Sequence, residues 1–246
     1  MSSNEKKLSV LGHLSELRKR LIRSLIIVAI TSIICFIFYE NIFDILIYPA
    51  PEGITLQAIK MTEMLGATMR VALICGIILA MPYLTYELIM FVSPALTRRE
   101  KTYVYIVLPW IALMFVAGVV FAYFILIPRM IGFLISWGSD IVSVQPMFSD
   151  YINVVTRLLL VVGLVFEMPV LTTFLSRIGI IKPKWLASKR KIAIIIIFIL
   201  AAIITPTIDP INQCLVAIPL IALYELSIWL SRLVYKRKTA VDIAPA

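Results

Sequence analysis

Residues 21–39 read LIRSLIIVAITSIICFIFY, and this apolar run decides the fold class. Nineteen helical residues reach about 28 Å, close to the roughly 30 Å of hydrocarbon in a bilayer. The whole chain has the same character: 61% of its 246 residues are hydrophobic and only 15% are charged, with a mean hydropathy of +1.01. A soluble domain needs more polar surface than this. The sequence therefore predicts an all-α integral membrane protein.

Six apolar segments predict six transmembrane helices in one polytopic membrane domain, residues 1–246. They lie at about 21–39, 65–92, 103–127, 151–175, 192–205 and 213–230. The fifth and sixth are short. Fourteen residues reach only about 21 Å, so we expect buried loop or locally thinned bilayer around the fifth. The outer stretch 129–150 is long enough to fold over the membrane surface.

Positive residues decide the predicted orientation. With six spans, all but four of the 23 lysines and arginines fall on one side; the four are Lys60, Arg70, Arg129 and Arg157. Positive residues mark the cytoplasmic side of a plasma or inner membrane, so both termini are predicted to be cytoplasmic, with a basic tail at 231–246. Because the charges flank apolar segments, they indicate topology signals and contacts with the anionic lipid bilayer, not binding of nucleic acid.

The chain offers no pattern typical of a catalytic or metal centre. Its three cysteines fall inside apolar segments at spacings that match neither a metal site nor a disulfide framework, and His13 is the single histidine. An intramembrane protease needs a Ser–His pair, an Asp pair or a metal triad at membrane depth. We therefore expect no catalytic residues, no metal and no cofactor. The charged first twenty residues also indicate no cleavable signal peptide.

Residues 10–21 read VLGHLSELRKRL. Leu14, Leu17 and Leu21 share one helical face, so the cytoplasmic residues 1–20 are predicted to include an amphipathic helix lying at the inner interface. Glu16 has a structural role available here, because an ion pair with Arg20 at i,i+4 is worth a few tenths of a kcal/mol.

Residues 91–101 read FVSPALTRREK. Pro94 ends the second span. Thr97, followed three residues later by Glu100, is a capping-box pattern that opens the next helix. Glu100 therefore also has a structural interpretation.

Glu167 lies in the run FEMP at 166–169, in the middle of the fourth span. A carboxylate at that depth costs on the order of 3 kcal/mol, so the default interpretation is functional. It is either protonated or faces a polar cavity. Pro169 cannot donate to the carbonyl of Val165, so we expect a kink. One alternative is an ion-coupled secondary transporter that uses Glu167 as its proton or cation site, although the chain shows no internal repeat.

Taken together, these segments resemble the TatC family, the core subunit of the twin-arginine protein translocase. The resemblance runs in order through HLSELRKR at 13–20, FVSPAL at 91–96 with Glu100, FEMP at 166–169, Thr205-Pro206, Asp209, Gln213, AIP at 217–219 and Tyr224-Glu225. The sequence departs from the family pattern at Glu87 and Ile89, where members often have Gln and Trp.

The resemblance implies a receptor that binds twin-arginine signal peptides at the cytoplasmic face. With TatA- and TatB-type single-span subunits, it implies export of folded proteins driven by the proton-motive force. The implied peptide site comprises Glu16, Arg18, Phe91, Pro94 and Glu100. The implied contacts for partner helices are Glu167, Pro169, Thr205 and Gln213. A homo-oligomer within a larger complex is also implied.

Overall fold

The computed structural model describes residues 3–51, 56–92, 98–137, 145–205 and 209–235, without side chains for 3–11, 92 and 98–103. These residues are almost entirely helical, apart from loops and one isolated bridge between Gln57 and Met147. In chain order the elements are α1 (Ser3–Ile37), α2 (Tyr39–Ile47), α3 (Glu63–Val92), α4 (Arg98–Phe121), the π-helical turn η2 (Ala122–Leu126), α5 (Ile127–Ser136), α6 (Phe148–Arg177), α7 (Pro183–Ser188), α8 (Arg190–Ile204) and α9 (Pro210–Val234).

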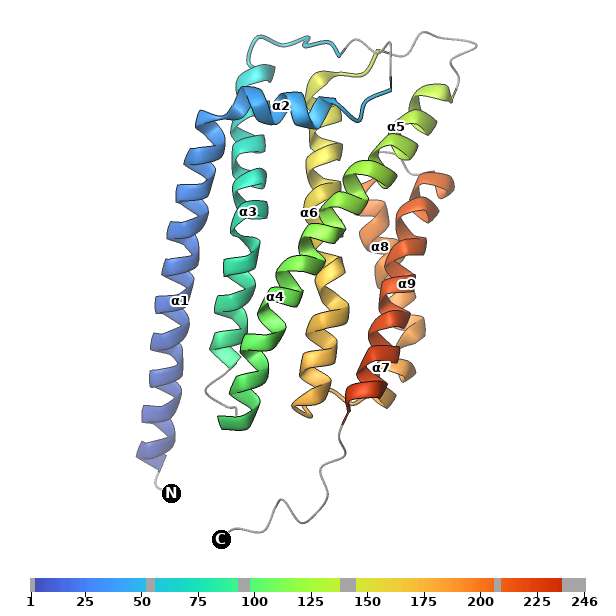
Figure 1. The fold of residues 1–246 in the computed structure, drawn as a ribbon. Helices are drawn as coiled ribbons and strands as arrows, with labels where there is room; N and C mark the ends of the chain where they lie inside the picture. Colours follow the sequence, from blue (N-terminus) through green and yellow to red (C-terminus); the bar gives the residue numbers. More distant parts are fainter. Residues whose placement is uncertain (1–2, 52–55, 93–97, 138–144, 206–208, 236–246) are drawn as a thin grey trace.

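The long helices stand side by side in a bundle (Figure 1). The start of α1, the end of α3, the start of α4 and the end of α9 all lie at one end, here termed the terminal end. Helix α2 lies across the opposite, far end (Figure 1). Residues 13–20 of α1 are therefore brought to the same end of the molecule as residues 91–92 of α3 and 98–101 of α4.

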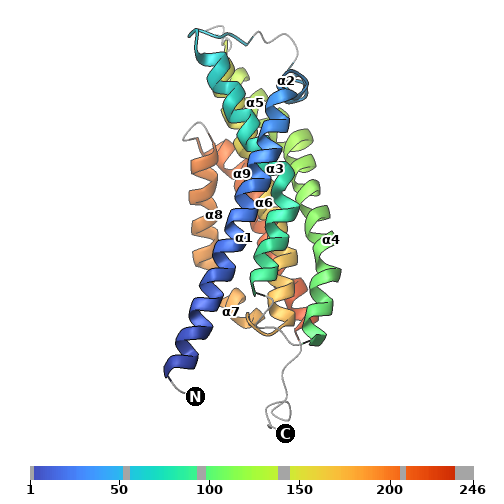
Figure 2. The same cartoon turned by 90° about the vertical axis from the view of Figure 1, so that its left-hand side faces the viewer.

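Five stretches of the described chain are long and apolar enough to cross a membrane: Gly12–Ile37, Glu63–Phe91, Val104–Ser136, Phe148–Arg177 and Pro210–Val234. This identifies a multi-pass membrane protein. The predicted fifth segment also forms a helix, α8, but its 15 residues reach only about 22 Å. Both views show α8 running from the side of α7 toward the far end and stopping short of α2 (Figures 1 and 2).

The predicted interfacial helix at the N-terminus is wrong in one respect. The segment does not form a separate helix across the bundle axis, because α1 runs without a break from Ser3 to Ile37. Residues 3–37 contain no proline. A bend would create two new helix termini, each with four unsatisfied backbone groups, so the chain continues along one axis.

The stretch predicted to fold over the membrane surface is also partly wrong. Residues 129–136 belong to α5, which continues the line of α4 through η2. Pro128 lies in the first turn of α5, directly after the π-helical turn. In the first turn of a helix the backbone N–H that proline lacks has no partner within that helix, so α5 accommodates Pro128 and continues from η2. Residues 138–144 of the predicted stretch lie outside the described chain.

Helix α1 is held to the bundle mainly by α3, through a close approach at Gly76. A Cβ atom built on Gly76 would lie 2.3 Å from Ser32 Oγ and 2.6 Å from Ser32 Cα. The Thr31 hydroxyl donates a hydrogen bond of 2.8 Å to the Gly76 carbonyl. Small residues let helix backbones approach in this way inside membranes, where packing and hydrogen bonds replace the hydrophobic effect between helices.

Helix α6 forms the centre of the bundle and packs against α3, α4 and α9. Its buried side chains extend from Phe148 near the far end to Ser176 near the terminal end. At Gly118 of α4, an added Cβ would lie 2.7 Å from the Phe166 side chain and 3.0 Å from Gly163 Cα. The position of α6 thus depends on small residues that allow α4 to approach closely.

We expect Gly76→Ala to separate α1 from α3, because the new methyl group collides with the backbone of Ser32. Overpacking of this kind costs about 1–3 kcal/mol. Thermal unfolding of the purified protein in mild detergent measures the loss. Gly66→Ala is the matched control in the same helix, since nothing lies within 4 Å of its Cβ position. Equal melting temperatures for the two variants would contradict the close approach.

Candidate functional sites

A cluster of charged and polar side chains joins α1 to α3 at the terminal end. We name Glu16, Arg20, Tyr83 and Glu87 the acid–arginine cluster. Arg20 donates from Nε (3.1 Å) and Nη2 (2.7 Å) to one oxygen of Glu16 and from Nη1 (2.6 Å) to Glu87. The Tyr83 hydroxyl donates to the other oxygen of Glu87 at 2.7 Å. One guanidinium group therefore bridges two carboxylates from different helices.

The i,i+4 pair of Glu16 and Arg20 predicted from sequence is confirmed. The contact of Arg20 with Glu87 was missed, because 67 residues separate them and no local periodicity connects them. The two carboxylates also differ in exposure. The Glu16 side chain is 32% exposed and that of Glu87 only 5%. The cluster thus has an outer acid and an inner acid.

The structure describes only some of the other residues that were predicted for a site at this end. His13 stacks on Phe91, with ring centroids 4.3 Å apart and planes 19° from parallel. Arg18 is exposed on α1. The backbone of Glu100 lies in the first turn of α4, and its side chain lies outside the described part of the structure. Pro94 and Thr97 also lie outside it, so the capping-box prediction is not tested.

Glu167 lies between α6 and α3, where it meets Thr85. The Thr85 hydroxyl contacts both carboxyl oxygens, at 3.0 and 3.2 Å, and Glu167 is only 2% exposed. The sequence left two alternatives for Glu167, a protonated carboxyl or a polar cavity, and both stay predictions. Thr85, 82 residues away in sequence, supplies a polar contact that the sequence did not indicate. Pro169, two residues further along α6, is buried as well.

A second polar group gathers at the far end of α8 and α9. Gln213 Nε2 donates to the Phe198 carbonyl at 2.9 Å, and the buried Thr205 hydroxyl donates to the Ala201 carbonyl at 3.0 Å. Asp209 caps α9 by accepting from the Asn212 backbone N–H at 2.7 Å. Asn212, which sequence reasoning missed, is 1% exposed, and its Oδ1 has no hydrogen-bond partner within the described chain.

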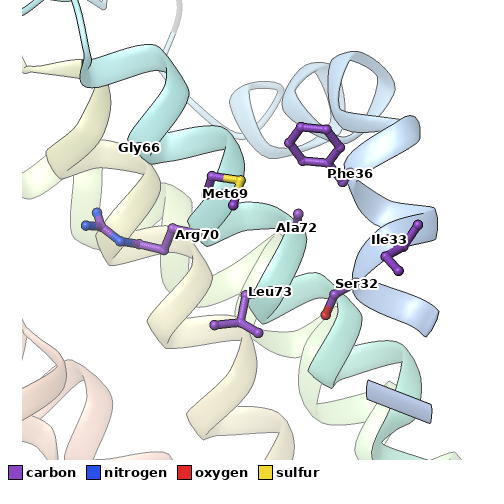
Figure 3. Close-up of a pocket in the computed structure, with 8 residues that line it drawn as sticks. All are labelled: Ser32, Ile33, Phe36, Gly66, Met69, Arg70, Ala72 and Leu73. Carbon is purple, nitrogen blue, oxygen red and sulfur yellow. The ribbon is translucent and has the colours of Figure 1, made fainter. Parts of the chain in front are cut away.

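A hollow of about 650 Å³ lies between α1 and α3 near the far end (Figure 3). Its walls are mostly apolar, with Phe36 and Met69 on opposite helices. Arg70 is the charged side chain among its lining residues and donates to Asn153 Oδ1 on α6. Arg70 is the one titratable side chain among these lining residues, so the hollow offers no pair of groups suited to proton transfer.

Nothing in the described chain forms a reaction centre. No group of three His, Cys, Asp or Glu side chains in the described ranges could hold a metal ion. Glu167 is met by the neutral hydroxyl of Thr85, an arrangement that does not favour an ion-coupling site. Five long apolar helices of the described chain, with polar groups at both ends of the bundle and Glu167 buried inside it, define a multi-pass membrane protein.

Comparison with known proteins identifies the family of this membrane protein. The family described as Sec-independent protein translocase protein (TatC) matches residues 12–219, so this chain belongs to the TatC family. Its members are non-enzymatic components of the twin-arginine protein translocation system. The prediction of the family from sequence is thus confirmed, and the chain is a membrane component of a translocase complex.

Individual relatives agree along nearly the whole chain. The TatC protein of Desulforapulum autotrophicum is 40% identical over 97% of this chain and 89% of its own length. That of Aquifex aeolicus is 39% identical over 94% and 98%, and TatCd of Bacillus subtilis 35% identical over 99% of both. A crystal structure of the twin-arginine translocase receptor TatC superposes with a TM-score of 0.83, at 37% identity, covering 90% of this chain and 99% of that one.

We expect Thr85→Val to destabilise the bundle, because it leaves the Glu167 carboxyl buried without its hydroxyl contact. An unsatisfied buried polar group costs about 1–3 kcal/mol. Thermal unfolding measures this cost. Thr68→Val in the same helix is the control, since the buried Thr68 hydroxyl donates only to the carbonyl of Met64 in its own helix. The assignment fails if both variants melt alike.

Proposed function

We propose that this chain is the receptor of a twin-arginine translocase. It binds twin-arginine signal peptides at the cytoplasmic face of the plasma (inner) membrane. Together with single-span subunits of the TatA and TatB type, it passes folded proteins across that membrane, driven by the proton-motive force. The observation that carries the proposal is the acid–arginine cluster, in which Glu16 holds a guanidinium group at the exposed end of the bundle.

The chemistry of that contact suits the arginine pair of such a peptide. A guanidinium is planar and presents several donors in a fixed fork, whereas a lysine ammonium is a point charge. In the cluster two nitrogens of Arg20 converge on a single oxygen of Glu16. An arginine from a peptide can make the same contact. Glu100, on the neighbouring helix α4, is proposed to bind the second arginine, with Arg18, Phe91 and Pro94 beside it.

The charge distribution supports an orientation with both termini in the cytoplasm. Among the described residues, the basic loop around α7 and α8 and the cations of α1 lie at the terminal end, where α1 starts and α9 ends (Figure 1). The positive-inside rule assigns that end to the cytoplasm. Six crossings follow if α8 spans the membrane, and its short length requires locally thinned bilayer or a flanking loop.

Partner subunits are proposed to contact the polar groups away from the peptide site. Thr205 and Gln213 bond within the chain, but hydroxyl and amide oxygens have further acceptor capacity. Glu167 and Pro169, two residues apart on α6, are buried in this structure and can contact a partner helix only after α3 and α6 separate around Thr85. A homo-oligomer within the larger complex completes the proposal.

Peptide binding gives the first test. We expect the full-length protein in nanodiscs to bind a twin-arginine signal peptide and to bind its twin-lysine variant about tenfold to a hundredfold more weakly, because the charge-assisted contact is lost. Glu100→Gln is expected to weaken binding by the same order, and Glu16→Lys or Glu100→Lys to abolish it. Fluorescence anisotropy of a labelled peptide measures the affinities.

Thermal stability is the control for those variants. If Glu100 only caps α4, the Gln variant keeps the cap and binds as the unchanged protein does. Wild-type affinity in Glu100→Gln therefore removes Glu100 from the site. Equal affinity for the two peptides removes the proposed function altogether.

Partner assembly gives a separate test. Replacing both Thr205 and Gln213 by Leu removes hydrogen-bonding groups worth about 0.6–2 kcal/mol each inside a membrane. We expect less of the single-span subunits to co-purify with the double variant in mild detergent. Thr68→Val serves as the control for loss of a hydroxyl elsewhere. Unchanged co-purification would place the partner contacts on other residues.

A further inference from the structure

The acid of the proposed peptide site is already occupied by a side chain of the protein itself. Arg20 makes two hydrogen bonds to Glu16 Oε1, and these are the bonds that a peptide arginine needs. Glu16 Oε2 receives no hydrogen bond from the described residues. A ligand guanidinium can therefore reach the free oxygen first, but it cannot use the whole carboxylate while Arg20 stays in place.

The position of Glu87 indicates where Arg20 goes. Glu87 is the inner acid of the cluster and already accepts from Arg20 Nη1 at 2.6 Å. It is also fixed by the Tyr83 hydroxyl. The Arg20 side chain is only 17% exposed, so releasing its guanidinium group without a partner is unfavourable. With Glu87 in contact, Arg20 can leave Glu16 and remain paired.

We propose that Arg20 is the internal occupant of the arginine-recognition site and that Glu87 is a further specificity-determining residue. An incoming guanidinium replaces Arg20 on Glu16, and Arg20 is retained by Glu87. This inference rests on the proposed function, since it assumes that Glu16 binds the peptide. It adds a third acid and a built-in competitor to that site.

Charge counting supports the exchange. The cluster holds two carboxylates and one guanidinium, which leaves one negative charge for one further guanidinium. Arg23, the next cation along α1, lies within electrostatic reach of Glu87 but forms no salt bridge within the described part of the chain. Glu16 is the more exposed acid, so exchange takes place there, while Glu87 is shielded from the peptide.

The exchange also explains how lysine is rejected. A competing lysine must displace two hydrogen bonds from one carboxylate oxygen with a single ammonium nitrogen, which lacks the fork geometry. Arginine restores both contacts. The internal occupant therefore sets a threshold that one guanidinium meets and one ammonium does not.

Two substitutions test the proposal because they act in opposite directions. Arg20→Lys keeps the charge and the pairing with Glu87 but loses the fork on Glu16. We expect twin-arginine peptide affinity to rise about three- to tenfold and discrimination against the twin-lysine peptide to fall. Glu87→Gln removes the alternative partner, which holds Arg20 on Glu16, and affinity is expected to fall about three- to tenfold. Anisotropy titrations in nanodiscs measure both.

The control is Arg23→Lys, the same replacement one turn further along α1, for which we expect wild-type affinity. If the cluster is purely structural, Arg20→Lys and Glu87→Gln both lower the stability of the protein, and neither raises its affinity for the peptide. The Arg20→Gln/Glu87→Gln double variant removes both inner charges together and guards against misfolding of a single variant. It too is expected to bind more tightly than the unchanged protein.

The outcomes separate the two proposals. If the unchanged protein does not distinguish the twin-arginine from the twin-lysine peptide, the proposed function fails. If it does, but neither Arg20→Lys nor the double variant gains affinity over Arg23→Lys, Arg20 is not a competitor and the inference is wrong while the function stands.

Discussion

A polar group that this bundle carries into the hydrocarbon is stabilised by a partner inside the protein, because lipid offers none. Helices satisfy their own backbones, so the remaining demand falls on side chains. Two threonine side chains find such partners: Thr31 donates to the Gly76 carbonyl, and Thr85 contacts the Glu167 carboxyl group. Both contacts require helices to approach closely, and both therefore determine which helices are neighbours.

Helix α6 is the helix on which the need for internal polar partners has the largest effect. Buried along most of its length, it packs against α3, α4 and α9 and gives Glu167 a site away from lipid. The polar groups that remain are placed at the two ends. The acid–arginine cluster lies at the terminal end, and the capped start of α9 with Asn212 at the far end. Exposed polar groups are therefore found at the ends of the bundle, while Glu167 on α6 is buried inside it.

Sequence reasoning succeeded where local spacing carries the information. Apolar length located the long helices, and a spacing of four residues predicted the pairing of Glu16 with Arg20. It failed where the answer depends on distant residues. Nothing around Arg20 points to Glu87, and nothing around Glu167 points to Thr85. The third segment was predicted to end near residue 127, but the π-helical turn η2 leads directly into α5, which contains Pro128 in its first turn.

The attachment of α1 through a single neighbour has a consequence for biosynthesis. Gly76 follows Thr31 by 45 residues, so at about 5–20 residues per second α1 waits several seconds in the bilayer before its partner is made. Only 6% of its most apolar window is buried in the finished bundle. Because α1 faces lipid in the finished bundle, its exposure to lipid before α3 is made costs little free energy. Helix α1, which is mostly exposed on the bundle surface, is thus synthesised before α3. The buried central helix α6 is synthesised only after its neighbours α3 and α4.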